Sequence, residues 1–336
     1  MAEKIILGVQ ANSRAKSIQI SFATDNIVTA YLWGAGGGAG GRESAGYPIG
    51  GNGSAGAAMK VVFRVSPGDL LELGVGTAGL AGAESAANAA GGAGGASWNS
   101  AGNNFSGGRG GNSGSIGVSG AGGGGGGATV LLLNGSPIAV AAGGAGGGGG
   151  GRNSAGSSAT NTASAAGSNA TGQNGQTKTT DGGGGGGGGG GHWGGLGGAA
   201  TGADVGGSAG TSGASWYSGD WTGTITLGSG AVSAKQGGYD VGTFGYGGVY
   251  SSTRNGQDGY MVLEFTQLHM PLVKVSGQWK QVANAYVKTN SVWKEINMIY
   301  TKVSGTWKNI VSIGEIPVVD QSPGSNWSAG GTRSYT

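Results

Sequence analysis

Short apolar segments separated by long glycine tracts form the basic pattern of this chain. Residues 17–24 and 27–33 are rich in β-branched and aromatic side chains that partly alternate with polar ones. Such alternation is typical of β-strands with one buried face. We therefore expect the folded structure to start with a hairpin of these two strands, preceded by a polar N-terminal arm over residues 1–16.

The same order of strand and glycine tract recurs along the chain. Further strands are expected at residues 58–65, 70–75, 128–133, 138–141, 222–227 and 259–265. The turn motif Ser66-Pro-Gly-Asp69 joins the first two of these, and Asn134-Gly135 joins the next two. Asn-Gly between apolar runs is the strongest short-range signal of a β-hairpin. No segment of about ten residues or more has the apolar periodicity of a helix, so the sequence predicts an all-β fold.

Glycine accounts for 85 of the 336 residues, and the longest uninterrupted run is Gly182–Gly191. Two interpretations of such tracts compete. In the first they are flexible linkers, because glycine loses more backbone entropy on ordering than any other residue. In the second they are polyglycine II helices, left-handed with about three residues per turn, whose backbones pack directly against each other because no side chain intervenes.

Flexible linkers would not require apolar strands at regular intervals between the tracts. We therefore favour ordered polyglycine II helices anchored by the strands. Linker behaviour should be confined to residues 152–180, where Ser, Thr, Asn and Ala are frequent. The predicted architecture of the glycine-rich domain, residues 17–266, is a small β-sandwich interleaved with polyglycine II helices.

Charge and cysteine content narrow the class of protein. The formal net charge is +3 with only 10% charged residues, so charge repulsion cannot keep the chain unfolded. The absence of cysteine excludes disulfide scaffolds and thiolate metal sites. The apolar run near Met1 is too short for the core of a signal peptide, and no stretch is long enough for a membrane-spanning helix. We expect a protein made without a secretory leader.

A second unit, residues 267–315, contains an internal repeat of 14 residues. Tryptophan recurs at this spacing, and so does lysine at two positions; the residues are Trp279, Trp293 and Trp307, Lys274, Lys288 and Lys302, and Lys280, Lys294 and Lys308. Each copy has the pattern of a strand, a two-residue turn and a second strand, so we expect three tandem β-hairpin repeats. The last residues, 316–336, are rich in Ser and Gly and should form a flexible tail.

The repeats are expected to mediate association. A two-residue turn would place Lys274 directly opposite Trp279, and the later copies would repeat this pairing. An isolated two-stranded hairpin is only marginally stable in water, so the repeats should pack on each other or on other chains. We expect a homo-oligomer and favour a trimer. Nucleic acid is an alternative partner for the lysines, but evenly spaced lysines more often form a solvated face, so none is expected.

The residues needed for common kinds of catalysis are absent or scattered. The two histidines, His192 and His269, lie in different units, so no Cys/His zinc site can form. A Ser/His/Asp triad would have to use His192 with Asp181 or Asp204, beside a glycine run that would position it poorly. No pair of carboxylates is placed as a glycosidase requires. We expect no catalytic residue, no metal and no cofactor.

Isolated aromatic residues within the glycine-rich segments remain as candidates for function. In one interpretation each packs against a neighbouring glycine segment as a small core. In the other, loops between rigid glycine helices present them to a partner, since Trp and Tyr offer a large contact area that suits sugar faces and protein pockets. The candidate receptor-binding residues are His192, Trp193, Trp216, Tyr217, Trp221 and Tyr246. Other aromatic residues of this kind are Trp98, Phe105, Tyr239, Phe244 and Tyr250.

Five motifs occur in order along the glycine-rich domain. They are Trp33-Gly-Ala-Gly-Gly-Gly, Ser66-Pro-Gly-Asp, Gly74-Val-Gly, Ala139-Val-Ala-Ala-Gly-Gly and Gln257-Asp-Gly-Tyr-Met-Val-Leu-Glu. In this order they resemble the glycine-rich domain of tail-fibre and receptor-binding proteins of tailed bacteriophages. The Trp-Lys repeats also look like modules appended to phage tail fibres. A similar domain occurs in the ectodomain of anaplastic lymphoma kinase, which the missing cysteines and leader disfavour here.

The resemblance implies recognition of a host cell surface by loops between polyglycine II helices. We therefore expect a non-enzymatic virion protein, a tail-fibre or tail-tip adhesin, made in the host cytoplasm. Its expected partners are other tail proteins and a host receptor, either a polysaccharide or an outer-membrane protein. Two alternatives stay open: a capsid or tail decoration protein that binds no receptor, and an enzyme that acts on surface polysaccharide.

Overall fold

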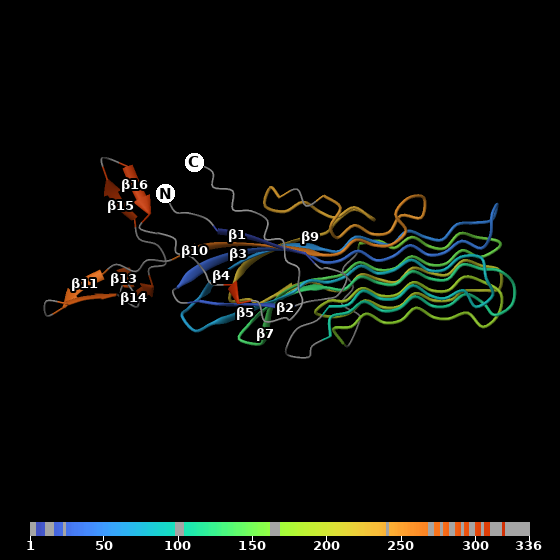
Figure 1. Ribbon diagram of the computed structural model, residues 1–336, viewed down its shortest axis with the longest axis horizontal. Helices are drawn as coiled ribbons and strands as arrows, with labels where there is room; N and C mark the ends of the chain where they lie inside the picture. The colour runs from blue at the N-terminus through green and yellow to red at the C-terminus, as the bar shows by residue number, and fades with distance from the viewer. Residues whose placement is uncertain are drawn as a thin grey trace.

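The computed structural model describes residues 5–10, 17–22, 25–97, 104–161, 169–239 and 242–267, together with strands within residues 272–309 and at 318–319. The described residues form strands and irregular segments and contain no helix, which confirms the predicted all-β fold class. Two antiparallel sheets lie at one end of the glycine-rich domain, and long glycine segments extend from them in one direction (Figure 1).

The sheets have five and six strands. The first has the order β1-β10-β3-β4-β9, with bounds β1 (Ile5–Gln10), β3 (Asn26–Trp33), β4 (Ala58–Val65), β9 (Thr222–Thr226) and β10 (Tyr260–Gln267). The second has the order β17-β2-β5-β6-β7-β8, with bounds β2 (Ser17–Ser21), β5 (Leu70–Gly74), β6 (Thr129–Leu133), β7 (Ser136–Ala141), β8 (Trp216–Tyr217) and β17 (Val318–Val319).

The main hydrophobic core draws on strands of both sheets. Alternate residues of β3, among them Val28 and Leu32, are fully buried in it, together with Leu71, Leu73 and Leu131 of the second sheet. Fully burying one such side chain contributes about 1.5–3 kcal/mol. The strands therefore provide the apolar burial that the glycine segments lack.

The predicted hairpin of residues 17–24 and 27–33 is wrong. Strand β2 pairs with β5 and β17, whereas β3 pairs with β4 and β10 in the other sheet. Both edges of β3 are thus occupied, by β10 and by β4, and none is left for β2. Gly34 N donates to Ala57 O (2.9 Å), so the pairing of Trp33 with Ala58 continues into the glycine segments.

The connection Ser66–Asp69 also differs from expectation. It does not close a hairpin, because β4 belongs to the first sheet and β5 to the second. By contrast, the Asn134-Gly135 hairpin between β6 and β7 is confirmed. Both turn residues have positive φ, 51° and 79°, as a type I′ turn requires. The Asn134 side chain accepts a hydrogen bond from Leu70 N (2.8 Å), which ties this turn to β5.

Two segments expected to be an arm and a tail contribute strands. Strand β1 pairs with β10 along its whole length, from Ile5 opposite Phe265 to Gln10 opposite Tyr260, so residues 5–10 are not part of an arm. Val318–Val319 pairs with β2. Each of these two short apolar segments pairs with a sheet edge that would otherwise be unpaired. In both cases the partner strand is distant in sequence. The rest of the predicted arm and tail lies outside the described residues.

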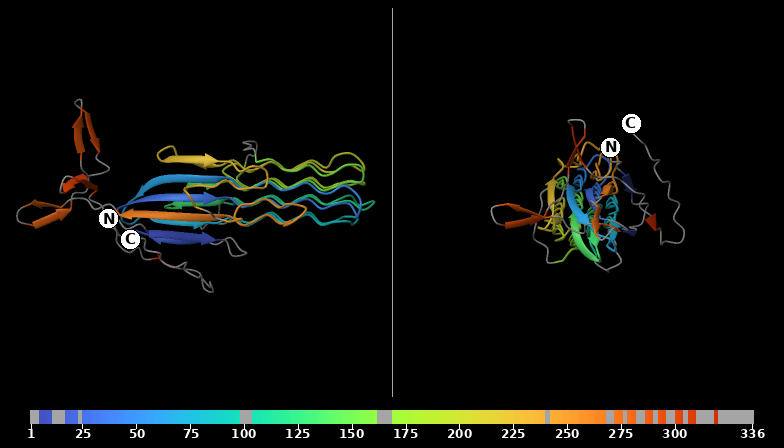
Figure 2. Two further views of the ribbon diagram at one scale, coloured as in Figure 1. Left: turned by 90° about the horizontal axis from the view of Figure 1, so that it is seen from above. Right: turned by 90° about the vertical axis from the view of Figure 1, so that its left-hand side faces the viewer.

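The glycine segments lie side by side and hydrogen-bond to one another (Figure 2). Along residues 34–41, successive backbone N–H groups donate in turn to three different neighbouring segments. Every third N–H group donates to the same segment. The donor–acceptor pairs are Gly34–Ala57, Gly37–Ser54 and Gly40–Gly51 on the first neighbour, Ala35–Gly127, Gly38–Gly124 and Gly41–Ala121 on the second, and Gly36–Gln257 and Ala39–Arg254 on the third. Backbone groups are thus satisfied between segments rather than within them.

Residues 152–180 are not a linker in the parts that the structure describes. Ser157 N donates to Gly207 O (3.0 Å), and Gln173 N donates to Gly195 O (2.9 Å). Gly156 and Ala159 are buried while the residues between them are exposed. One small residue in three therefore faces the bundle here, and the Ser side chains between them point to solvent.

Three separate two-stranded sheets follow the glycine-rich domain. Their strands are β11 (Leu272–Val275), β12 (Gln278–Gln281), β13 (Tyr286–Thr289), β14 (Val292–Glu295), β15 (Tyr300–Val303) and β16 (Thr306–Asn309). Their registers place lysine opposite tryptophan in each pair, Lys274 with Trp279, Lys288 with Trp293 and Lys302 with Trp307. This is the register expected of a two-residue turn; the turn residues lie outside the described part of the chain.

Candidate functional site

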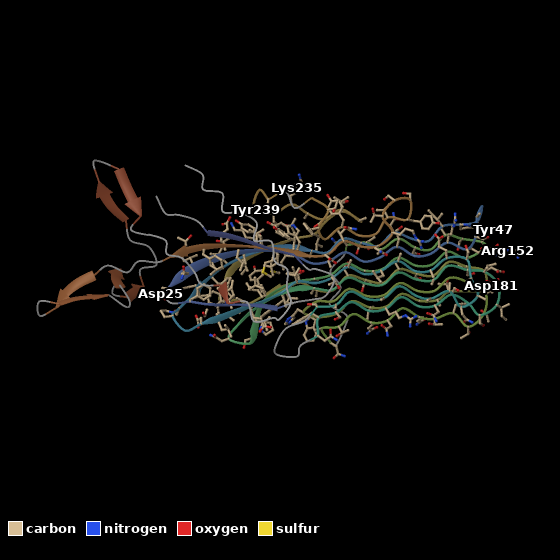
Figure 3. The ribbon with its side chains drawn as sticks, in the orientation of Figure 1. Asp25, Tyr47, Arg152, Asp181, Lys235 and Tyr239 are labelled. Carbon is tan, nitrogen blue, oxygen red and sulfur yellow. The ribbon has the colours of Figure 1, made fainter. Side chains whose placement is uncertain are left out.

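The turns at the end of the bundle remote from the sheets form one surface, here called the distal tip. Figure 3 labels three of its residues, Tyr47, Arg152 and Asp181. The turns that contribute lie around residues 42–49, 84–88, 115–119, 152–154, 178–182 and 202–205. Hydrogen bonds connect them: Asn153 N donates to Asp204 O (2.8 Å), and the Ser119 hydroxyl donates to Asp181 Oδ1 (2.9 Å).

Charged residues of the bundle are concentrated at this end. Within the glycine-rich segments 34–57, 76–128, 142–215 and 242–259, all charged residues except Arg109 and Asp258 lie at or beside the distal tip. The inner segments have no room for side chains, so charge is placed mainly where the chain turns in solvent; Arg109 is exposed on the outer side of a segment. The tip is therefore chemically distinct from the rest of the bundle.

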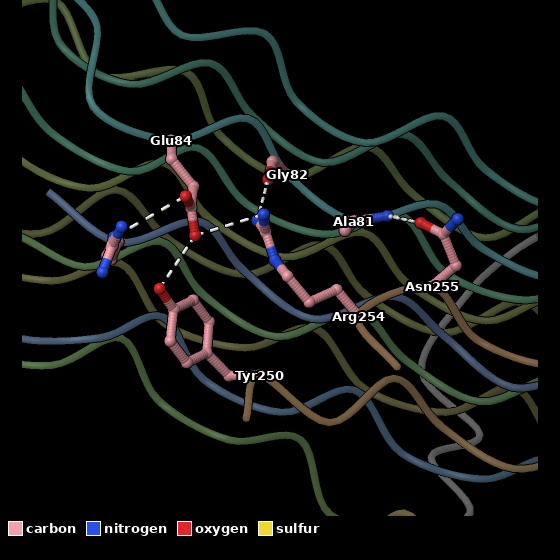
Figure 4. Close-up of polar contacts among 7 residues, drawn as sticks. Ala81, Gly82, Glu84, Tyr250, Arg254 and Asn255 are labelled. Atoms are coloured by element: carbon pink, nitrogen blue, oxygen red, sulfur yellow. Dashed lines mark hydrogen bonds and ion pairs between the residues drawn. The ribbon is translucent and has the colours of Figure 1, made fainter. Parts of the chain in front are cut away.

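One carboxylate beside the tip holds a network of four side chains (Figure 4). Glu84 pairs with Arg254 (3.1 Å) and Arg42 (3.6 Å) and accepts a hydrogen bond from the Tyr250 hydroxyl (2.8 Å). Arg254 also donates to Gly82 O (2.6 Å). Desolvation and the Glu84 carboxylate raise the pKa of Tyr250. The network joins three separate turns and makes this side of the tip rigid.

A second carboxylate, Glu43, is buried at the tip with a relative exposure of 6%. Its Oε2 atom has no hydrogen-bond partner. Burial raises the pKa of Glu43, and the negative charges of Asp181 and Asp204 add to this effect while Arg152 opposes it. Glu43 is thus held in an unfavourable environment for a charged group, unlike Glu84.

Large apolar side chains are also exposed on the distal tip. They are Tyr47, Ile49, Ile116 and Val118, and Ile116 is the most exposed at 66%. Exposed apolar side chains that gather on one surface mark a binding site more often than single ones do. The tip therefore combines exposed apolar side chains with charged ones.

Three of the aromatic residues predicted from sequence come together at the other end of the ten-glycine run. His192 stacks on Trp216 with ring centroids 4.5 Å apart and an interplanar angle of 15°, and it forms a T-shaped pair with Trp193 with centroids 5.2 Å apart. We call these three residues the aromatic cluster. Trp216 belongs to β8 and pairs with Val140 of β7, so the cluster lies beside the sheets and not at the distal tip.

Backbone hydrogen bonds hold the aromatic cluster in place. His192 N donates to Ala214 O (2.8 Å), and Ala214 N donates to Trp193 O (2.8 Å). Trp216 packs against a small core that includes Phe105, whereas Trp193 is 44% exposed. Burial lowers the pKa of His192, which keeps the imidazole neutral at pH 7.

The other predicted receptor-binding residues do not join this cluster. Tyr217 and Trp221 pack against the main core, and Trp221 contacts Phe63 edge-on at 5.9 Å. Tyr246 is half-buried in the bundle wall, where its carbonyl oxygen accepts from Gln257 N (2.7 Å). Tyr217 and Trp221 thus contribute to the main core, and a role of these three residues in receptor binding stays a prediction.

The remaining aromatic candidates lie in several different environments. Phe105 is buried, Tyr239 donates a hydrogen bond to Glu264 (2.5 Å), and Phe244 stacks on Tyr260 at 4.8 Å. Trp98 lies outside the described residues. The repeat residues Trp279, Trp293 and Trp307, and their lysine partners, are placed by strand register alone.

Searches for other kinds of site gave no candidate. Across the described ranges no group of three or more Asp, Glu or His residues is arranged to hold a metal ion. In the same part of the chain no helix is long and apolar enough to cross a membrane.

No model of a protein family matches the chain, and no curated protein matches it either.

Sequence reasoning did not identify the distal tip. A usable signal was nevertheless present, because most charged residues that interrupt the glycine tracts lie where the chain turns, as at Arg42-Glu43, Glu84, Arg152 and Asp181, with Arg109 and Asp258 as exceptions. A charged residue cannot fit between closely packed backbones, so such an interruption often marks the end of a segment. The argument from aromatic residues led instead to the aromatic cluster and to parts of the core.

Proposed function

We propose that this protein is a virion protein of a tailed phage, a tail-fibre or tail-tip adhesin that binds the host cell surface through the distal tip. The observation that carries the proposal is the concentration of charged side chains, with exposed apolar ones among them, on the turns at one end of a glycine-rich rod. A binding protein needs such side chains on its outermost surface, where a partner can reach them.

The arrangement of the bundle supports this role. We infer that its segments are polyglycine II helices, because their hydrogen bonds to each neighbour recur at every third residue. Such a bundle holds its turns on a stiff support, so the tip loses little conformational entropy when it binds a partner. The motif order that resembles phage tail-fibre proteins points to the same function.

The hairpin repeats suit an assembly role within the same proposal. Each is a two-stranded sheet with tryptophan opposite lysine, and such hairpins are only marginally stable alone. We propose that they associate in a homo-oligomer, with a trimer favoured, and connect the protein to other tail proteins. Several copies on one virion would bind the host multivalently, so weak single contacts would add up to firm attachment. No enzymatic activity, cofactor or nucleic-acid partner is part of the proposal.

Competition for phage adsorption tests this function. Purified protein is added to host cells before the phage that carries it, and free phage is counted. We expect the wild type to block adsorption. Replacing the most exposed tip residue, Ile116→Asp, should reduce blocking at least about tenfold, as expected for a central apolar contact. Leu80→Asp is the matched control, because Leu80 is 47% exposed on a glycine segment rather than in a tip turn.

The outcomes separate the proposal from its alternatives. Blocking that survives Ile116→Asp and is lost with Leu80→Asp would move the binding surface from the tip to the flank of the bundle. Failure of the wild type to bind any host cell would favour a decoration protein. In that case loss of the protein from the virion should change particle stability and leave adsorption intact.

A further inference from the structure

We propose that the aromatic cluster of His192, Trp193 and Trp216 is a saccharide-binding site that takes one pyranose ring of a neutral glycan on the exposed face of Trp193. This site is separate from the distal tip and does not depend on the function proposed for it. Three observations carry the inference: the geometry of the rings, the polar groups next to them and the rigidity of their support.

The geometry leaves one ring available to a ligand. Trp216 is covered on one side by His192, stacked at 4.5 Å, and packs with the small core around Phe105. His192 and Trp193 form a T-shaped pair with ring centroids 5.2 Å apart and an interplanar angle of 75°. Trp193 is the most exposed of the three, at 44%. An exposed indole on a packed aromatic base provides a flat apolar surface for the C–H face of a sugar.

Hydrogen-bonding groups lie beside this surface. A neutral imidazole has one donor and one acceptor nitrogen, and His192 is half-buried next to the indole. Asn169 is exposed, and its carbonyl oxygen accepts a hydrogen bond from Gly194 N (2.6 Å), directly after Trp193. Its side-chain amide offers further donors and an acceptor. Hydroxyl groups of a sugar need both kinds of partner, and both are present.

The same features argue against a protein ligand. A stable protein interface buries about 800 Å² on each partner, whereas the aromatic cluster exposes a single large ring. The cluster also carries no charge, because burial lowers the pKa of His192. One ring with neutral polar groups at its edge matches the size and chemistry of a sugar residue.

The support of the site is rigid before any ligand arrives. Trp193 and Ala214 form an antiparallel bridge, and Trp216 is part of the second sheet. Little conformational entropy is then lost on binding, which favours recognition of a small, weakly bound ligand.

Histidine NMR on the intact protein tests the site directly. The chain has two histidines, His192 and His269, so selective ¹³C labelling of histidine gives two Cε1–H signals. Linear oligosaccharides of glucose, galactose, mannose and N-acetylglucosamine serve as probes. We expect at least one of them to shift the His192 signal in a saturable manner while the His269 signal stays in place.

Variants distinguish a binding site from a local disturbance. Trp193→Ala should weaken binding of the active oligosaccharide at least about tenfold, and Trp193→Tyr should restore most of it, because a flat aromatic ring is retained. Tyr47→Ala is the matched control: Tyr47 is also 44% exposed but lies on the distal tip, so affinity for the sugar should not change.

The proposal is overturned if none of the four oligosaccharides shifts the His192 signal, or if Trp193→Ala binds as tightly as the wild type. Neither result concerns the adsorption assay, in which the tip variants are measured against whole cells. Failure of the saccharide site and failure of the adhesin function are therefore separate outcomes.

Discussion

A methyl group on the Cα atom of Gly187 would lie 2.1 Å from the carbonyl oxygen of Gly108. That is far inside van der Waals contact, and the oxygen belongs to the backbone of a neighbouring segment. Gly187 N also donates a hydrogen bond to Gly123 O (2.8 Å). The distance between segments is therefore set by backbone against backbone, and glycine is required inside the bundle by packing.

Gly187→Ala should destabilise the protein by about 3 kcal/mol or more, because the Gly108 segment must move and strain its hydrogen bonds. Thermal unfolding followed by circular dichroism measures the effect. Gly219→Ala is the control, since a Cβ there meets nothing within 4 Å, and it should change stability by no more than about 0.5 kcal/mol. Equal melting temperatures for the two variants would contradict the close packing of the bundle.

Gly135→Ala tests the turn between β6 and β7. A Cβ at Gly135 would also meet nothing within 4 Å, but its φ is 79°. The expected loss of about 1–2 kcal/mol comes from the left-handed backbone alone. Denaturant titration of both variants, Gly135→Ala and Gly219→Ala, isolates this cost in unfolding free energy. A Cβ atom has free space at either site, so the two sites differ only in backbone conformation. A loss no greater than that of Gly219→Ala would argue against the type I′ turn.

Glu43→Gln should stabilise the protein at pH 7. The folded state raises the pKa of Glu43, so it binds the proton more tightly than the unfolded chain does. The stability contributed by this group is therefore present at low pH and is lost as the pH rises through the raised pKa. Melting temperatures measured between about pH 4 and pH 8 should show a gain for the variant that disappears on acidification.

Glu84→Gln is the matched control for this prediction, because Glu84 has two arginine partners and a tyrosine donor. Removing the negative charge of Glu84 should destabilise the protein by about 1 kcal/mol at pH 7, as expected for a partly exposed ion-pair network. A lower melting temperature for Glu43→Gln at pH 7 would show that the Glu43 carboxylate has a favourable partner in solution.

The hairpin repeats should determine the oligomeric state. Replacing all three repeat tryptophans, Trp279, Trp293 and Trp307, by alanine is expected to convert the oligomer to monomers, because each hairpin then loses its largest apolar residue. Sedimentation equilibrium gives the mass. The control replaces Lys280, Lys294 and Lys308 by Gln, positions that the register places next to the tryptophans and on the opposite face. A wild-type protein that sediments as a monomer would overturn this role.

Local patterns predicted the elements of the fold well. Alternation in residues 27–33, the Asn134-Gly135 turn and the 14-residue spacing of tryptophan each depend on residues close in the chain, and the structure has the corresponding strands, turn and register. Predictions failed where the partner is far away in sequence. Strand β2 finds β5, and β1 finds β10, because burial and edge pairing outweigh nearness along the chain.

For the candidate site, too, the sequence indicated some features and could not indicate others. Aromatic residues in glycine-rich surroundings led to His192, Trp193 and Trp216, which do form one cluster, but equally to Tyr217 and Trp221, which are part of the core. Composition reports that an aromatic residue is present and not which surface it faces. The distal tip was missed because its turns are spread along residues 42–205, so that residues it brings together, such as Glu43 and Asp204, are far apart in sequence.

The sequence by itself determined the all-β class, the glycine segments and the repeat, because strand periodicity, the lack of side chains and a regular spacing are properties of the chain alone. Only the tertiary structure decided which strands share a sheet and which turns share the distal tip. Those relationships depend on backbone hydrogen bonds between segments that share a glycine-rich composition. Glycine supplies no side chain to specify its neighbour, so the order of segments in the bundle follows from how the sheets anchor their ends.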